Sequence, residues 1–225
     1  MKILAIDTTT KFLCLGLYDN GKTYEYNFDL GKRQSALLLV TIKRALEALS
    51  WKITEIDYFA CGVGPGSFTG LRVGLSTIKG LAWSIRRPII ALPTLDILAK
   101  NAAESTAPYI MPVIDAKRNL IYCSIYSNKN KELKRIAPYM LLCEKDFLKR
   151  AKDKSVIFGD ALNLYHDSFT TNLKNCVFLD KDYWGLLPRH LIALSLERIR
   201  DKKIDDSFGV KPIYLYPKDC QIKNG

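Results

Sequence analysis

The residues of this chain that are best suited to chemistry are two aspartates, each at the end of an apolar run. Asp7 ends the segment KILAID and is followed by three threonines. An aspartate can order metal-bound water, and hydroxyls with backbone N–H groups can meet phosphate oxygens. Asp115 ends a similar run, but Lys117 and Arg118 follow it. The first turn is typical of a phosphate site, whereas the second fits badly because it lacks glycines that let a backbone approach phosphate.

A glycine-rich loop, GPGSFTG, is the second candidate for phosphate binding. It precedes an apolar pattern of helical period, and a helix N-terminus can hold an anion with its unpaired N–H groups. The alternative is a tight strand-to-helix turn in which a hydroxyl caps the helix. The loop is not a Walker A sequence, because no Lys-Ser/Thr pair follows the glycines, and Phe68 stands where a serine hydrolase needs glycine. The residues that could lie near a phosphate or nucleotide are Asp7, Thr8, Gly64, Gly66, Ser67, Thr69, Gly70 and Arg72.

The composition argues against a metal or disulfide site. The chain has only two histidines, His166 and His190, and they form neither HExxH nor HxxxH. Six scattered cysteines form no CxxC pair and mostly lie in apolar runs. We therefore expect reduced, mostly buried thiols. We predict no metal, no cofactor and no catalytic residue.

A surplus of basic residues favours a polyanionic partner. Lysine and arginine number 34 against 23 acids, a formal net charge of +11. Nucleic acid is the first such partner, because each phosphate that is neutralised releases counterions, although a solvated basic surface explains the charge equally well. Apolar runs such as Ala36 to Val40 are far shorter than the ~18 residues of a membrane span. The opening MKILAID has no apolar signal region, so we expect a cytoplasmic protein without a membrane contact.

The elements that must position these residues read as an α/β chain. KILAID, FLCLGLYD and TYEYNFDL predict three strands, with a hairpin turn at Asp19-Asn20-Gly21. Helical periods follow over Gln34 to Leu49 and Leu71 to Ile85. The apolar arc of the first helix is about 200° wide, more than covering a sheet requires, so we expect a second face to meet another subunit. A glycine inside the second helix needs close contact, within its own domain or with another molecule. The interface candidates are Leu38, Leu39, Ile42, Leu46, Leu71, Gly74, Leu75 and Ile78.

The chain contains a faint internal repeat. After the small, polar stretch from 101 to 108, the opening pattern returns. We predict two halves of related fold, residues 1–104 and 105–225, although chance matching of strand patterns is the alternative. A shift of 108 residues aligns Ile6-Asp7 with Ile114-Asp115, Leu13 with Ile121, Leu17-Tyr18 with Ile125-Tyr126, and Asn20 with Asn128.

Two halves that each begin with a strand ending in aspartate resemble the outline of the sugar kinase, Hsp70 and actin superfamily. We therefore predict an α/β fold of two such units, each a mixed sheet with helices, the second smaller and degenerate. The resemblance implies phosphates and Mg²⁺ between the two turns. One hypothesis is thus a small ATP-dependent kinase or transferase that uses Asp7 with Asp115.

A second, more specific resemblance covers essentially the whole chain. Residues 61 to 82, CGVGPGSFTGLRVGLSTIKGLA, closely resemble the signature of the TsaB (YeaZ) family. ILAIDTTT near the start, VIDAKRNLIY at 113 to 122 and KPIYLYP at 211 to 217 match that family in order and spacing. The resemblance implies a bacterial subunit that works with TsaD in making N6-threonylcarbamoyladenosine at position 37 of tRNA. It also implies a TsaD-like fold without the metal-binding histidines of TsaD.

The same resemblance implies the partners. It implies pairing with TsaD through N-terminal helices, a homodimer when the chain is alone, the ATPase TsaE as a further subunit, and contact with tRNA only within the complex. The chain departs from the family at Gln34-Ser35, where many relatives have His-Ser, and at Tyr216, where arginine is common. We predict a non-catalytic scaffold that holds TsaD active, with the kinase or transferase as the alternative.

Overall fold

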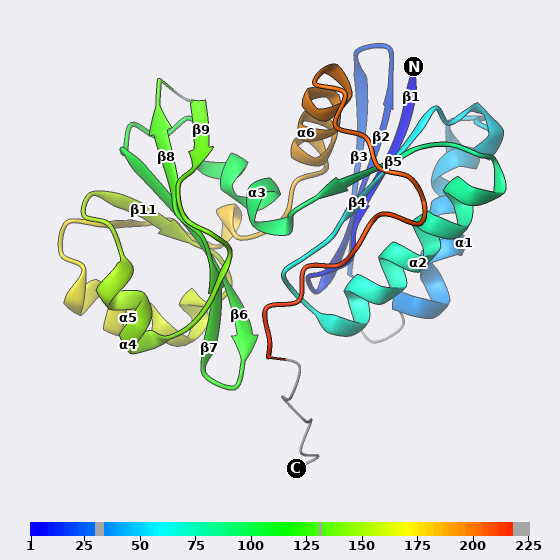
Figure 1. Ribbon diagram of the computed structural model, residues 1–225. Coiled ribbons are helices and arrows are strands. Elements are labelled where there is room, and N and C mark those ends of the chain that lie inside the picture. The colour runs from blue at the N-terminus through cyan, green and yellow to red at the C-terminus, as the bar shows by residue number, and fades with distance from the viewer. Residues whose placement is uncertain (30–33, 131, 218–225) are drawn as a thin grey trace.

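The structure, a computed structural model, describes residues 1–29, 34–130 and 132–217. Two mixed sheets lie on opposite sides of the molecule (Figure 1). The prediction of an α/β fold of two units, each a mixed sheet with helices, is confirmed. Among the helices in the described residues, none has both the length and the apolar character that a membrane span needs.

The first unit is built on a five-stranded sheet in the order β3-β2-β1-β4-β5. β1 lies at its centre, antiparallel to β2 and parallel to β4. Five consecutive residues of β1 are buried, because helices cover both faces of the sheet. The strands are β1 (Lys2–Asp7), β2 (Phe12–Asp19), β3 (Lys22–Asp29), β4 (Tyr58–Gly62) and β5 (Ile89–Leu92).

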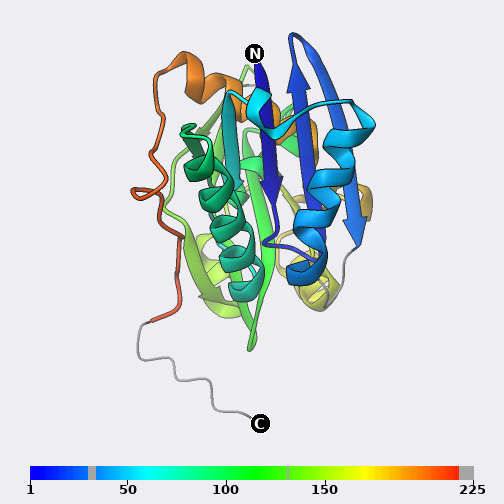
Figure 2. The ribbon, with the colours of Figure 1, turned by 90° about the vertical axis from the view of Figure 1, so that its right-hand side faces the viewer.

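Three longer helices cover this sheet. Helices α1 (Gln34–Ala48) and α2 (Phe68–Ser84) lie side by side on one face (Figure 2). Helix α6 (Pro188–Arg200) packs on the other face, against β1, β2 and β3. A short 3-10 turn, η2 (Ile53–Glu55), precedes β4, and α3 (Thr94–Ala99) with η3 (Lys100–Ala102) leads to the second unit.

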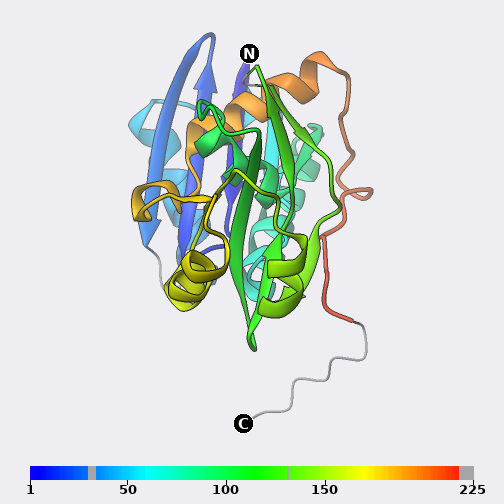
Figure 3. The same cartoon turned by 90° about the vertical axis from the view of Figure 1, so that its left-hand side faces the viewer.

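The second unit has a seven-stranded sheet with the path β10-β7-β6-β11-β12, and β8 and β9 join beside β6 (Figure 3). It has more strands than the first sheet, but all except β6 are of four residues or fewer. Its elements are β6 (Tyr109–Lys117), β7 (Leu120–Cys123), β8 (Tyr126–Lys129), β9 (Glu132–Arg135), β10 (Met140–Cys143), α4 (Glu144–Arg150), β11 (Ser155–Phe158), α5 (Leu162–Asn172), β12 (Val177–Phe178) and η4 (Lys181–Tyr183).

The two sheets share one topology. β6 runs antiparallel to β7 and parallel to β11, as β1 does to β2 and β4. The internal repeat is therefore real in its first strands. The alignment fails further on, because Asn20 lies in a hairpin turn with a φ of 45° whereas Asn128 lies in β8 and is buried. The turn of the second unit comes two residues later, at Asn130.

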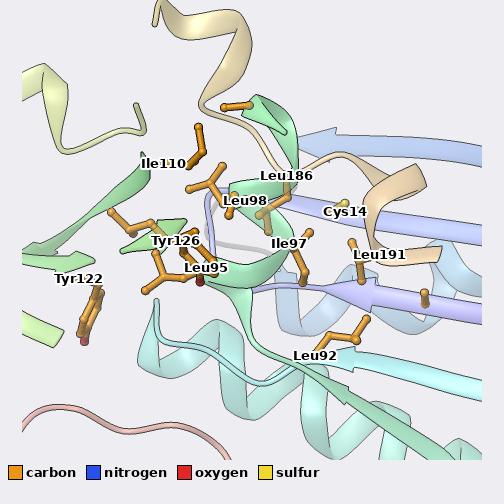
Figure 4. Close-up of a cluster of buried hydrophobic side chains, with 14 of the residues drawn as sticks. Cys14, Leu92, Leu95, Ile97, Leu98, Ile110, Tyr122, Tyr126, Leu186 and Leu191 are labelled. Carbon is orange, nitrogen blue, oxygen red and sulfur yellow. The ribbon is translucent and has the colours of Figure 1, made fainter. Parts of the chain in front are cut away.

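A hydrophobic cluster joins the two sheets (Figure 4). Leu95 and Leu98 of α3 pack there with Ile110 of β6, and Leu191 of α6 belongs to the same cluster. The space between the units is thus filled with apolar side chains at this level. The predicted division at residue 104 stays a prediction, and α6, from the second half, packs on the first sheet.

Candidate functional site

Asp7, the first candidate residue, lies at the C-terminal end of β1 and is fully buried. Its Oδ1 accepts hydrogen bonds from the backbone N–H and the hydroxyl of Thr9, at 2.7 and 2.6 Å. Its Oδ2 accepts one from the hydroxyl of Thr94, at 2.8 Å. Burial raises the pKa of the Asp7 carboxyl, and these three donors oppose that rise. Both oxygens therefore face protein donors rather than solvent.

Glycines of the central motif make room for this turn. A Cβ atom on Gly62 would lie 1.9 Å from Oδ2 of Asp7, and one on Gly66 would lie 2.7 Å from Cβ of Thr9. The backbone N–H of Ser67 then donates to the Thr9 carbonyl at 2.8 Å. β4 and the following loop thus lie directly against the threonines that follow β1.

Gly74 has the same role on α2. A Cβ atom there would lie 2.1 Å from Oγ1 of Thr8, whose hydroxyl donates to the Gly70 carbonyl at 2.7 Å. Thr8 is almost fully buried. The close contact that this glycine needs is therefore with its own unit. This contact matches the within-domain alternative, and a contact of Gly74 with another molecule stays a prediction.

The loop from Gly64 to Gly70 ends in a capped helix. The side chain of Ser67 accepts a hydrogen bond from the Gly70 N–H at 3.3 Å, so Ser67 is the N-cap of α2. The carbonyl of Gly64 accepts from the Thr94 N–H at 2.8 Å. Ser67 and Thr69 are exposed at the helix start. Their role near a phosphate stays a prediction.

Arg72 is engaged by aromatic side chains. Its guanidinium lies 3.8 Å from the ring centroid of Phe68, and its Nε donates to the Tyr214 hydroxyl at 3.1 Å. The rings of Phe68 and Tyr214 are 5.4 Å apart. Arg72 thus holds the C-terminal segment against the start of α2.

The second aspartate turn neutralises itself. Asp115 accepts from the backbone N–H of Lys117 at 2.8 Å, and its other oxygen lies 2.5 Å from the Lys117 Nζ. Lys117, Arg118 and Asn119 all have φ between 53° and 63°, a left-handed run at the β6–β7 hairpin. The Asp115 N–H donates to Asp160, whose pKa is raised by burial. A lysine cation therefore pairs with this carboxylate.

The C-terminal segment links the two turns. It passes between the two units (Figure 1). The Ile213 N–H donates to the Val63 carbonyl at 2.8 Å, and the Tyr216 hydroxyl donates to the Ala116 carbonyl at 2.7 Å. The ring of Tyr216 meets that of Tyr122 edge to face at 6.2 Å. Tyr216, one of the two departures noted above, thus holds this segment on the second hairpin; the side chain of Gln34, the other, lies outside the described residues.

Comparisons with known proteins agree with this architecture. A family model described as TsaD, tRNA N6-adenosine threonylcarbamoyltransferase, matches residues 30–169. The tRNA threonylcarbamoyladenosine biosynthesis protein TsaB of Bacillus subtilis strain 168 is 30% identical over 229 residues, covering 99% of this chain and 97% of that protein. The chain belongs to the TsaB family. The sequence resemblance stated above is therefore confirmed.

Two further similarities support the TsaB assignment. The TsaB of Escherichia coli strain K12 is 34% identical over 128 residues, covering 56% of this chain and 55% of that protein. The solved structure of YeaZ from Pseudomonas aeruginosa has a TM-score of 0.78 at 24% identity and covers 95% of this chain and 99% of that one. The structural likeness shows that the two chains share a fold.

Most residues predicted for a TsaB interface lie in the core. Leu39 is 55% exposed, and it is the exception among the eight candidates. The interface role of these residues stays a prediction, and in the single chain the other seven pack within their own unit. The residues buried in their own unit are Leu38, Ile42, Leu46, Leu71, Gly74, Leu75 and Ile78.

Sequence reasoning missed Thr94 as a partner of Asp7 in this TsaB chain. Thr94 begins α3 directly after β5, and Asp7 ends β1 in the same sheet. The carboxyl ends of parallel strands gather at one edge of a sheet, so a polar residue just after β5 was the available signal. Thiol burial was predicted correctly for Cys14, Cys61 and Cys123, which are free and buried.

Proposed function

We propose that this protein is a non-catalytic subunit of the machinery that makes N6-threonylcarbamoyladenosine in tRNA, where it pairs with TsaD and supports the activity of that enzyme. Membership of the TsaB family supports the pathway. The observation that carries the non-catalytic role is the closed turn at Asp7, whose two oxygens accept hydrogen bonds from Thr9 and Thr94. We propose a cytoplasmic location as part of the same function.

The two turns together favour a scaffold over the kinase or transferase alternative. Phosphoryl transfer depends on metal ions and on donors that surround the phosphates. In the first turn the carboxylate is buried under protein donors, and in the second the Lys117 ammonium lies on Asp115. Neither carboxylate is free to hold Mg²⁺ without rearrangement. This arrangement supports a chain that contributes binding surface.

The outward faces of α1 and α2 form the surface that we propose for TsaD. α1 exposes Leu39 and Val40, two large apolar side chains one turn from Ala36. α2 exposes Ser76 and Gly80, and nothing lies within 4 Å of the position that a Gly80 Cβ would take. Small residues let another helix approach closely, and apolar residues beside them supply buried area. This paired-helix face, rather than the buried residues first predicted, carries the proposed contact.

The same paired-helix face serves the proposed homodimer. A single apolar face can be self-complementary about a two-fold axis, so the isolated chain uses it for a second copy when TsaD is absent. The two pairings then compete. TsaE, as the ATPase of the assembly, and tRNA are the further partners that we propose for the complex.

Reconstitution tests this function. Unmodified tRNA, TsaD, TsaE and threonylcarbamoyl-AMP are combined with and without this protein, and modified adenosine is measured. We expect product to form at an appreciable rate only when the protein is present. Gly80→Leu should weaken the affinity for TsaD by about tenfold, because the leucine side chain would occupy the space through which a TsaD helix approaches α2. Gly185→Leu is the matched control, because that glycine also has nothing within 4 Å of its Cβ position and lies in the second unit.

Two outcomes would contradict the proposal. One is equal product with and without the protein. The other is phosphoryl transfer from Mg-ATP by the isolated chain, lost in Asp7→Ala, which would favour the kinase or transferase. Unchanged TsaD pairing in both Gly80→Leu and Leu39→Asp would place the contact on another face.

A further inference from the structure

A hollow of about 570 Å³ opens at the C-terminal end of α2. Its walls come from the end of α2, from the turn into β5 and from the segment that follows α6, which descends beside α2 in Figure 2. Two aromatic side chains stand at its edge and remain largely in solvent, Trp83 at 66% exposure and Phe208 at 80%. Exposed rings of this size at one opening are unusual, because burial of each would stabilise the fold.

Cations surround the same hollow. Arg86 and Arg87 line it and are exposed. In the parts of the chain that the structure describes, neither guanidinium lies within 4.0 Å of a carboxylate. Lys79, which lies in α2 and does not line the hollow, donates from its Nζ to the Phe208 carbonyl at 3.5 Å. The five N–H donors of each arginine are thus available to an anion.

The two acids in the walls are committed to the backbone. Asp206 accepts from the N–H groups of Phe208 and Gly209 at 2.7 and 2.5 Å, and these bonds lower the pKa of its carboxyl. Asp205 pairs its backbone with Ile89 and accepts from the Ala91 N–H at 3.3 Å. The Asp206 carboxylate therefore builds the turn that carries Phe208, and the Asp205 carboxylate ties the segment to β5. Arg86 and Arg87 line the hollow together with these two acids, and the charge of Lys79 also lowers the pKa of Asp206, so three cations stand against two acids around the opening.

We propose that this hollow binds a single-stranded segment of RNA. Bases stack on exposed aromatic faces without regard to sequence, and phosphates are held by guanidinium groups. Lys79 lies within α2, whereas Arg86 and Arg87 follow its end, so the cations come from two successive segments of the chain. The chain as a whole carries a net charge of +11, which favours the same partner.

The site rests on the proposed function only in its natural ligand, tRNA. It goes beyond that function because the hollow belongs to the isolated chain. Trp83 comes three residues after Gly80, about 4.5 Å along α2, so the hollow adjoins the paired-helix face. RNA binding is therefore measured without TsaD, and TsaD pairing is measured without RNA.

Fluorescence anisotropy tests the site on the full chain without TsaD or TsaE. The probes are a labelled 12-nucleotide single-stranded RNA and an unmodified tRNA transcript, each titrated at several salt concentrations. Trp83→Ala should weaken binding by about tenfold, as expected for loss of one stacked base. The double variant Arg86→Gln/Arg87→Gln should reduce the slope of log affinity against log salt by about 1.4, two phosphates at ~0.7 each.

Matched controls separate this site from the general charge of the chain. Lys149→Gln/Arg150→Gln removes the same two charges from the exposed end of α4, and Tyr183→Ala removes an exposed ring from the second unit. Both should bind RNA as the unaltered protein does. Equal weakening by the two double variants, or no effect of Trp83→Ala, would overturn the proposal. So would loss of TsaD pairing in Trp83→Ala with RNA binding unchanged, which would mark the hollow as a protein contact.

The reconstituted reaction keeps the two proposals distinguishable. If the protein supports TsaD but Trp83→Ala binds RNA normally, the RNA site is refuted and the subunit role stands. If RNA binding depends on Trp83 but the protein does not affect TsaD, the subunit role is refuted and the RNA site stands.

Discussion

Replacing Gly74 with alanine tests whether the motif glycines serve the turn after β1. The new Cβ would lie 2.1 Å from Oγ1 of Thr8, so the threonine must move and give up its hydrogen bond to the Gly70 carbonyl. Overpacking of this kind costs about 1–3 kcal/mol, and the buried hydrogen bond about 1 kcal/mol more. The helix regains about 1 kcal/mol from the exchange of glycine for alanine. We therefore expect the free energy of unfolding to fall by about 2 kcal/mol.

Gly80→Ala is the control on the same helix. Nothing lies within 4 Å of its Cβ position, so only the gain in helix propensity acts. The free energy of unfolding should rise by up to about 1 kcal/mol. The two alanine variants then differ by about 3 kcal/mol, which for a chain of this size is roughly 6–12 °C in Tm.

Urea unfolding followed by circular dichroism measures both changes. Thr8→Ala should lessen the cost of Gly74→Ala, since the hydroxyl that clashes is then absent, and a double-mutant cycle reports this coupling. If Gly74→Ala stabilised the chain as Gly80→Ala does, with no coupling to Thr8, the glycine would not be making room for that turn and the reasoning would be refuted.

Two pH profiles of opposite sign provide further tests. Burial raises the folded-state pKa of the Asp7 carboxyl above its ordinary value of 3.8, so the contribution of Asp7 to stability should fall as pH rises from 3.8 through the folded value. Asp7→Asn should remove that fall from the free energy of unfolding measured in urea from pH 4 upward. An unchanged pH profile would contradict the burial of an ionisable carboxyl at this position. Burial, with the nearby charges of Arg189 and Lys100, lowers the pKa of His190 to about 4. The contribution of His190 to the free energy of unfolding is therefore complete above pH 6.5 and should be lost as pH falls toward 4. His190→Gln should lessen this loss, and identical acid unfolding of the two proteins would refute the assignment.

The strands and turns were predictable because their patterns are local. KILAID predicted a strand, which β1 confirms, and the aspartate at its end has a counterpart in β6. The shared strand order follows from that repeat. The capping of α2 was also predictable as one of two alternatives, since the loop offers hydroxyls at Ser67 and Thr69; Ser67 is the cap, and Thr69 lies in the first turn of the helix.

The faces of the helices were harder to predict. The apolar arc of a helix indicates which residues are buried. It does not show whether they are buried in the core of the chain or against a partner molecule. Leu38 and Leu39 are neighbours in sequence, and α1 places the first under the sheet and leaves the second in solvent. The two glycines of α2 could not be told apart for the same reason. Thr8 occupies the space beside Gly74, whereas nothing lies within 4 Å of the Cβ position of Gly80, and only the structure shows this difference.

Helix α6 has a consequence for how the polypeptide reaches its native state. A Cβ atom on Gly16 of β2 would lie only 3.0 Å from the side chain of Ile192 in α6. One face of the first sheet is therefore covered by residues that are synthesised more than 170 positions later. During translation one apolar face of the first sheet therefore stays exposed until α6 has been synthesised. Contacts between residues this far apart in sequence also form slowly. A fragment that stops after α3 should therefore aggregate instead of behaving as an independent module.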